Sequence, residues 1–312
     1  MPHPQSRDML AYAALVFTTL FWAGNAVVAR GMIDTIPPMG LSFWRWMLAF
    51  LIILPFAAPH LRAALPTVRQ HWGSLFLLAL LSAGLFNSLL YLSAHTTTAV
   101  NISLVSAVMP IMIGLMAFLL LGERLARWQM YGITLALVGV LVIVSRGSLD
   151  VLLSVDFAAG DLLMVIAVAC WGLYSVLLKK RGIQMHPVAL LAVMIAMALP
   201  VVLLFHLVEI ALGYHTKLGG ELVAPLLYVA IFPSLLSYMG WNFGVKVLGP
   251  SRSAMFLYLL PLFGAVLSIL FLGEGLHLYH AAGGVLVLGG LYLSTRIQRT
   301  PAMRMVEERR KR

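Results

Sequence analysis

The chain has little charge. Only 10% of its 312 residues are Asp, Glu, Lys or Arg, while 62% are hydrophobic and the mean hydropathy is +0.97. Soluble domains average about 25% charged residues, because a water-facing surface needs charge to stay dispersed. The shortage of charge argues strongly against a large soluble globule.

Residue types that many enzymes and pumps need are also scarce. The single cysteine, Cys170, lies in an apolar stretch, which excludes an internal disulfide and a cysteine-cluster metal site. None of the eleven acidic residues lies in the middle of a hydrophobic run, so no chain of carboxylates is available as a proton relay. A phosphate-binding Walker motif is missing, which argues against ATP as the driver. His206 stands alone near the end of a hydrophobic run, and we expect a structural role for it.

Long hydrophobic runs dominate the chain. A membrane-spanning helix needs about 20 mainly apolar residues, and helices rather than open strands satisfy their own backbone hydrogen bonds in lipid. The first run is too long for a signal peptide and nine similar runs follow it. We therefore predict an all-α membrane protein with ten spans, at residues 10–30, 38–57, 74–94, 98–121, 128–145, 159–178, 187–209, 222–246, 253–272 and 278–295.

The basic residues are distributed unevenly between the loops. If the N-terminus lies in the cytoplasm, 17 of the 21 Lys and Arg residues fall on the cytoplasmic side and three on the other, with Arg45 inside the second span. Cytoplasmic loops carry such an excess. A basic run can also indicate nucleic-acid binding, but beside a membrane it is more typical of contact with anionic lipid. We predict a multi-pass protein of the bacterial inner membrane, with both termini and a basic tail at 296–312 in the cytoplasm.

The chain repeats itself. A shift of 151 residues superposes Pro110 on Pro261, Leu121-Gly122-Glu123 on Leu272-Gly273-Glu274, and Gly132 and Gly139 on Gly283 and Gly290. Earlier in each half, a shift of 149 superposes Trp22 on Trp171 and Pro38 on Pro187. We therefore predict one repeat at 1–148 and a second at 149–295. Because each repeat has five spans, the second enters the bilayer inverted.

Inverted repeats favour a transport function. Secondary transporters recurrently use this architecture, with the substrate site near the bilayer midplane between the halves. Exchange of conformation between the halves gives inward-facing and outward-facing states of similar energy.

The order of motifs resembles a known family. The segment from Phe21 to Asn25, Pro38 and Arg45, and the stretch from Pro110 to Glu123 resemble an EamA-type repeat of the drug/metabolite transporter superfamily, and Gly160-Asp161, Trp171, Pro187, Pro261 and Gly273-Glu274 resemble a second copy. The resemblance covers almost the whole chain except its two ends. It implies a ten-helix carrier with a central cavity that exports or exchanges small metabolites, nearest to bacterial exporters of aromatic and other amino acids.

Polar and aromatic side chains form matching pairs in four spans. Trp22 and Asn25 share one helix face, as Trp171 and Tyr174 do at the corresponding place in the second half. Likewise the pair Asn87 and Tyr91 corresponds to the pair Tyr238 and Asn242, in which asparagine and tyrosine have exchanged positions. Such groups pack helices together or line a cavity for a flat, partly polar solute. We favour the cavity.

One charge lies inside a span. Arg45, whose counterpart is Met194, either extends its guanidinium toward the interface or attracts a carboxylate of the substrate. Asn101 is a further candidate for the cavity lining.

Other matched residues lie where helices end or bend. Glu123 and Glu274 are expected to cap or gate helix ends, while Pro110 and Pro261 kink the fourth and ninth spans. The glycines of the fifth and tenth spans provide small faces, either for packing or for a weak homodimer; a monomer is the other possibility.

Two function classes compete with a carrier. A membrane-embedded transferase would need clustered carboxylates, histidines or a metal, and the only acidic grouping is Asp150, Asp156 and Asp161. A channel or a non-transporting scaffold is the third possibility. We expect a non-enzymatic transporter without metal or cofactor, whose partners are a small-molecule substrate and membrane lipid rather than nucleic acid.

Overall fold

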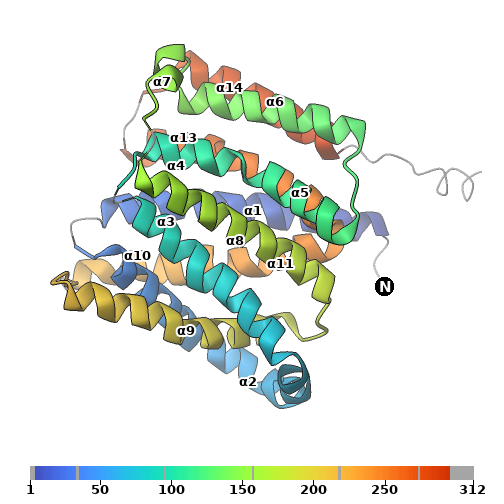
Figure 1. The fold of residues 1–312 in the computed structure, drawn as a ribbon, viewed down its shortest axis with the longest axis vertical. Coiled ribbons are helices and arrows are strands. Elements are labelled where there is room, and N and C mark those ends of the chain that lie inside the picture. Colours follow the sequence, from blue (N-terminus) through green and yellow to red (C-terminus); the bar gives the residue numbers. More distant parts are fainter. Residues whose placement is uncertain are drawn as a thin grey trace, which may run out of the picture.

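The computed structural model describes residues 4–32, 35–94, 96–156, 158–216, 219–272 and 275–295. Within these ranges the chain is helical and contains no strand (Figure 1). Nine helical stretches of the described chain are long and apolar enough to span a membrane, with mean hydropathies from 1.2 to 2.9. The predicted all-α membrane fold is confirmed.

The helices of the first half are α1 (Pro4–Gly31), α2 (Pro38–Ala79), the π-helix η1 (Leu80–Phe86), α3 (Asn87–Ser93), α4 (Ala99–Ala107), α5 (Met109–Leu121), α6 (Arg127–Val144) and α7 (Leu149–Leu153). Those of the second half are α8 (Ala159–Arg181), α9 (Pro187–Ala211), the 3₁₀-helix η2 (Gly220–Leu222), α10 (Val223–Val229), the π-helix η3 (Ala230–Leu236), α11 (Ser237–Leu248), α12 (Pro250–Ala254), the 3₁₀-helix η4 (Met255–Tyr258), α13 (Leu259–Leu272) and α14 (Leu278–Thr295).

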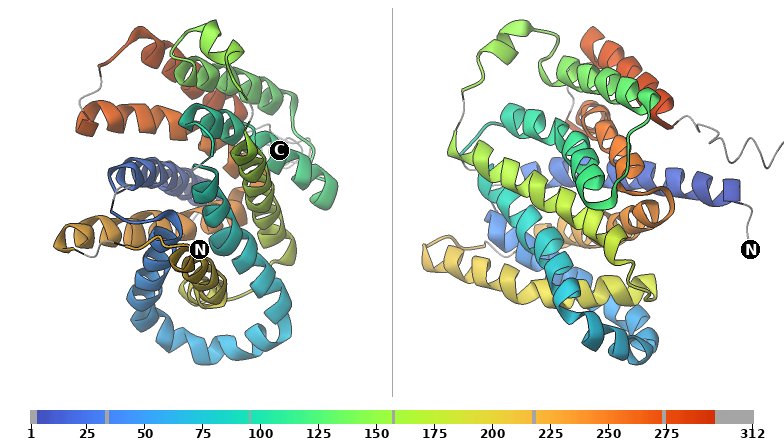
Figure 2. Two further views of the ribbon diagram at one scale, coloured as in Figure 1. Left: turned by 60° about the vertical axis from the view of Figure 1, so that its left-hand side comes forward. Right: turned by 45° about the vertical axis from the view of Figure 1, so that its right-hand side comes forward.

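The second and third predicted spans are joined by helix, not by the expected loop. Residues 38–93 form one helical path, which is why nine stretches replace ten. Pro55, Pro59 and Pro66 lie inside α2, and His71 has non-helical backbone angles (φ −116°, ψ 19°). Each proline removes a backbone hydrogen bond and bends the helix. The path therefore reverses in a helical arc (Figure 2), and its two limbs supply two crossings.

Corresponding helices of the two halves pack antiparallel. On α6 and α14, a Cβ added at Gly132 would lie 2.5 Å from the carbonyl oxygen of Gly290, and one at Gly139 would lie 2.6 Å from that of Gly283. Because these four glycines are related by the 151-residue shift, the contact is reciprocal. The glycine faces are thus used between α6 and α14 within the chain, and a homodimer through them stays an untested prediction.

The same relation holds for α2 and α9. Glu209 near the end of α9 binds the start of α2, while His60 of α2 stacks on His186, directly before α9, with ring centroids 3.7 Å apart. Antiparallel packing of corresponding helices confirms that the repeats are inverted. Figure 1 shows α6 and α14 at one end of the bundle's long axis, α2 and α9 at the other, and α1, α3, α8 and α11 between them.

Further helix contacts occur twice, once between helices of each corresponding set. Helix α1 packs on α11 and α13, just as α8 packs on α3 and α5. The π-helices η1 and η3 also correspond, each directly before the polar residues of the third and eighth spans. π-helical turns are rare and occur frequently at functional sites.

The fourth and ninth spans are interrupted where the sequence predicts kinks. Helix α4 ends at Ala107 and α5 begins at Met109, directly before Pro110; η4 precedes α13, which contains Pro261. The missing amide hydrogen of proline and the clash of its ring with the preceding turn explain both breaks. That these helices flex during transport stays a prediction.

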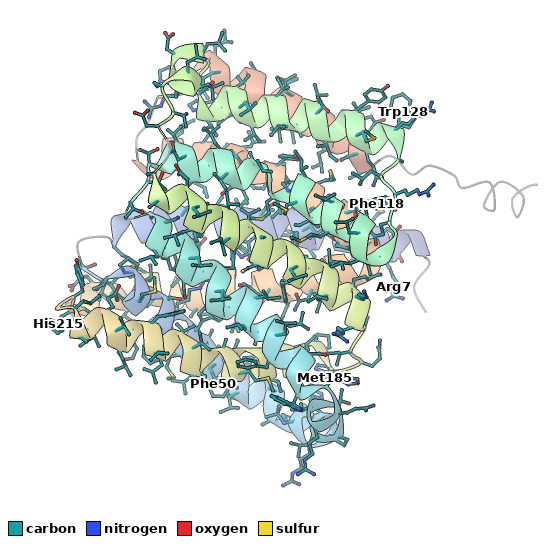
Figure 3. All side chains as sticks on the ribbon, in the orientation of Figure 1. Arg7, Phe50, Phe118, Trp128, Met185 and His215 are labelled. Atoms are coloured by element: carbon teal, nitrogen blue, oxygen red, sulfur yellow. The ribbon has the colours of Figure 1, made fainter. Side chains whose placement is uncertain are left out.

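Side chains differ between the ends and the flanks of the bundle. Large apolar side chains such as Phe118, Leu119 and Leu270 are exposed along the flanks, as a lipid-facing surface requires. Figure 3 places Arg7, Trp128 and Met185 toward the right-hand side of the view and His215 at the left-hand side, that is, near opposite ends of the helices.

The glycine contact between α6 and α14 predicts a stability effect. In Gly132→Ala the new methyl group collides with backbone of α14, and such overpacking costs about 1–3 kcal/mol. The matched control is Gly264→Ala, because a Cβ there meets nothing within 4 Å. Unfolding by dodecyl sulfate in mild-detergent micelles measures both variants. Equal stability of Gly132→Ala and wild type would contradict the close packing.

Candidate functional site

Aromatic rings from α1, α2, α8 and α11 meet in the middle of the bundle. The ring of Trp171 lies 5.2 Å from Trp22, 5.5 Å from Tyr238 and 5.4 Å from Trp241, measured between centroids. Trp46 packs edge-on against Tyr238 at 5.0 Å. These five residues are called the aromatic cluster below. Apart from Trp22, each is at most 2% exposed.

Three amide–phenol hydrogen bonds accompany this cluster. Asn25 Nδ2 donates to the Tyr91 hydroxyl at 3.4 Å, Asn87 Nδ2 donates to the Tyr238 hydroxyl at 3.0 Å, and the Tyr174 hydroxyl donates to Asn242 Oδ1 at 2.5 Å. All six residues are among those predicted from the sequence. We call the three bonds the amide–phenol ladder.

The repeat symmetry passes through this site. Asn87 and Tyr238 are 151 residues apart and therefore occupy corresponding positions of the two halves, yet they bond to each other. Trp22 and Trp171, which correspond under the 149-residue shift, also touch, with ring planes at 84°. A side chain can contact its own counterpart only beside the pseudo-twofold axis. The site therefore lies where the two halves meet.

Carbonyl groups of the two π-helices accept hydrogen bonds from side chains of the centre. Asn87 Nδ2 also donates to the carbonyl of Ser82 in η1 at 3.3 Å, and Trp22 Nε1 donates to the carbonyl of Pro233 in η3 at 3.0 Å. Irregular helix at membrane depth is tolerated where protein or a cavity surrounds it. The two π-helices thus anchor side chains of the centre.

Arg45 joins one end of the ladder. Its side chain is buried, with 1% exposure; Nε donates to Ser234 Oγ at 2.6 Å and Nη1 to the Tyr91 hydroxyl at 2.9 Å. The guanidinium carbon also lies 4.9 Å from the centroid of the Trp46 ring. Arg45 therefore does not extend to the interface but turns into the protein. Its contact with Ser234 was not foreseen, because Ser234 corresponds to an alanine, Ala83, and carries no repeat signal.

The side chains of the centre pack against one another in this conformation. The two pockets described lie elsewhere: one of about 390 Å³ between α5 and α6, and one of about 270 Å³ beside Tyr12, Phe256 and α14. Yet polar atoms at the centre remain unpaired among the described residues: Asn25 Oδ1, Trp46 Nε1 and Trp171 Nε1. Buried polar atoms without partners are costly, and a bound ligand is one explanation for them.

The structure separates Asn101 from this centre. Asn101 Nδ2 donates to Asp161 Oδ2 at 2.9 Å, and the Thr97 hydroxyl donates to the other oxygen of that carboxylate. Asp161 also accepts from the backbone amide of Ala158, so it caps the start of α8. Both oxygens are occupied, as expected for a structural cap. The described residues contain no group of three or more His, Cys, Asp or Glu placed to hold a metal.

Glu123 links the two halves at a helix end. Its Oε2 accepts a hydrogen bond from the Ser251 hydroxyl of α12 at 2.7 Å. The matching Glu274 lies outside the described residues, as does the predicted basic tail.

Sequence reasoning missed Glu209. This residue is 9% exposed, and its carboxylate accepts hydrogen bonds from the backbone amides of Met39 at 2.9 Å and Gly40 at 2.7 Å. His206, which we expected to stand alone, lies 3.7 Å from the same carboxylate and stacks on Phe43. An anion at a helix start satisfies free amide groups and the positive end of the helix dipole. The partner amides lie about 170 residues away, so no local pattern reveals them.

The Glu209 contact gives a second prediction. Glu209→Gln keeps the shape but removes the charge at the start of α2, which we expect to cost about 1–2 kcal/mol. Glu221→Gln changes an exposed carboxylate and serves as control. Melting temperatures of the purified proteins in one detergent test this. A drop in both variants, or in neither, would exclude the capping role.

Comparisons with known proteins agree with this architecture. The sequence profile of the EamA-like transporter family matches residues 9–145 and 158–296, once in each half. A crystal structure with 18% sequence identity superposes with a TM-score of 0.74, covering 93% of this chain and 97% of the other; this likeness shows the fold.

Three curated relatives span nearly the full chain. The uncharacterized transporter YyaM of Bacillus subtilis is 27% identical, covering 95% of this chain and 97% of the relative. A probable terminal-alkyne amino-acid exporter of Streptantibioticus cattleyicolor is 27% identical, covering 91% and 92%. A probable amino-acid metabolite efflux pump of Salmonella typhimurium is 26% identical, covering 91% and 95%.

Proposed function

Since the chain belongs to the EamA-like transporter family, we propose that it is a secondary carrier that moves amino acids, aromatic or other neutral ones, out of the cell. The solute passes through the centre of the bundle by alternating access. The observation that carries this proposal is the hydrogen bond between the corresponding residues Asn87 and Tyr238, which puts the polar centre on the axis between inverted repeats.

The amide–phenol ladder supports alternating access at this place. Its three bonds follow one another along the spans, with the Asn25–Tyr91 and Tyr174–Asn242 bonds at corresponding places on either side of the axis. A solute moving through the centre must exchange these bonds for bonds to itself. Because the halves correspond, opening toward one face uses the same kind of contact as opening toward the other.

The chemistry of the centre supports an amino-acid substrate. Ring faces of the aromatic cluster suit an apolar or aromatic side chain, and the amides and phenols suit polar groups. Two of the relatives are named as exporters of amino acids or their metabolites, which supports outward movement.

The distribution of charge supports the orientation. The basic loops before α6 and after α8 lie at the same end as α12, since Glu123 and Ser251 bond there and Lys179 Nζ donates to the carbonyl of Lys246. An excess of Lys and Arg is typical of the cytoplasmic side. This end is therefore proposed to face the cytoplasm of a bacterial inner membrane.

The proposed function is tested by removing the hydroxyl group of Tyr238. Tyr238→Phe breaks the bond on the axis and leaves the ring contacts, so we expect amino-acid flux in proteoliposomes to fall about tenfold or more, as for loss of one buried bond. The matched control is Tyr258→Phe, because Tyr258 is buried and its hydroxyl has no partner among the described residues.

Flux is measured with a panel of labelled amino acids, with and without a pH gradient. Full activity of Tyr238→Phe, together with full activity of Trp171→Ala in the aromatic cluster, would contradict transport through this centre. Failure of the wild type to move any amino acid would refute the proposed substrate class.

A further inference from the structure

Arg45 is a buried cation without a carboxylate partner. The one acidic–basic side-chain pair recorded among the described residues is His206 with Glu209, and both acceptors of Arg45, Ser234 and Tyr91, are neutral hydroxyls. A buried charge is costly unless it is paired, and intramembrane arginine usually marks a ligand or ion pathway. The unmatched positive charge therefore favours an anionic group as its ligand.

The neighbouring phenol is set to donate to the same anion. The Tyr91 oxygen accepts from Arg45 Nη1 and from Asn25 Nδ2, which occupies both of its lone pairs. Its own hydrogen has no recorded acceptor within the described chain. A carboxylate placed here meets the guanidinium and the phenol hydrogen together, in charge-assisted hydrogen bonds.

A free acceptor stands beside these donors. Asn25 Oδ1 is buried and has no hydrogen-bond partner among the described residues, although its Nδ2 bonds Tyr91. A carbonyl oxygen accepts from an ammonium group. The ammonium and carboxylate of an α-amino acid share one carbon, so one small site with adjacent donors and acceptor matches both. Trp22, one turn before Asn25, adds a ring of the aromatic cluster next to this acceptor.

The second half lacks the buried positive charge. The bond between Tyr174 and Asn242 repeats the one between Asn25 and Tyr91, but Met194 stands where Arg45 would be, and it is 1% exposed. The charge therefore sits on one side of the axis. A substrate with one anionic group can bind it in one orientation, with its side chain toward the aromatic cluster.

We propose that Arg45, Tyr91 and Asn25 form the subsite that binds the α-carboxylate and α-ammonium of the transported amino acid, and that this subsite excludes amines without a carboxylate. The inference rests on the proposed function and adds the group that is recognised. Arg45 is then the specificity-determining residue of the carrier.

The test compares matched ligands on the full-length purified protein. Proteoliposomes preloaded with phenylalanine or leucine take up the labelled amino acid by counterflow, and the external competitors are the amino acid itself and its decarboxylated amine, phenylethylamine or isoamylamine. For the wild type we expect the amine to compete at least about tenfold less well, as for loss of a charge-assisted hydrogen bond.

Variants assign that preference to Arg45. Arg45→Met copies the second half and should reduce the tenfold preference to about one, whereas Arg45→Lys should keep most of it. Met194→Leu, a buried change at the corresponding place, should leave the preference intact. A melting temperature for each variant shows whether it is folded.

The outcomes separate the two proposals. Equal competition by amine and amino acid on the wild type would overturn the subsite while leaving a working carrier, and needs no variant. An unchanged preference in folded Arg45→Met would overturn the role of Arg45. No counterflow of either amino acid by the wild type would instead refute the proposed substrate class.

Discussion

A side chain bonded to its own counterpart organises this protein. The hydrogen bond from Asn87 to Tyr238 joins corresponding positions of two inverted repeats, so it can form only beside the pseudo-twofold axis. Corresponding helices also meet on either side of this centre, where Gly132 of α6 contacts Gly290 of α14 and Glu209 of α9 binds the start of α2. Two copies of one five-span unit thereby enclose a single polar centre, and the energy of that centre depends on both.

The lipid environment explains why the few buried polar groups are hydrogen-bonded to one another at specific places in the fold. In hydrocarbon an unpaired backbone or side-chain group is costly, so departures from regular helix occur only where something else satisfies them. The π-helices η1 and η3 provide such places, since their carbonyls accept from Asn87 and Trp22. Arg45 adds a charge to one half alone. The fold is nearly symmetric, but the buried positive charge belongs to one half alone.

Much of this could be predicted from the sequence. Hydrophobic length predicts the spans, the repeat predicts the inversion, and the matched pairs of asparagine and tyrosine mark all three bonds of the ladder. The helical arc between the second and third spans was predicted as a loop, because prolines and charges there resemble a loop in sequence although they bend a helix. Asn101 bonds Asp161 at the start of α8, a contact between distant segments that the sequence pattern does not reveal. Glu209 and Ser234 act through contacts between distant segments, which periodicity cannot reveal.

The pseudo-twofold axis relates a distance at one membrane face to the corresponding distance at the other face. Gly31 and Tyr214 at one face correspond, under the 149-residue shift, to Lys180 and Leu65 at the other, and all four are exposed. Spin labels at these two pairs, in a variant without Cys170, report both distances while substrate is present on one side or the other of the membrane. If the halves exchange conformation, the distance that one pair shows in the first state appears in the other pair in the second state. Distances that lengthen or shorten together at both faces would contradict the account.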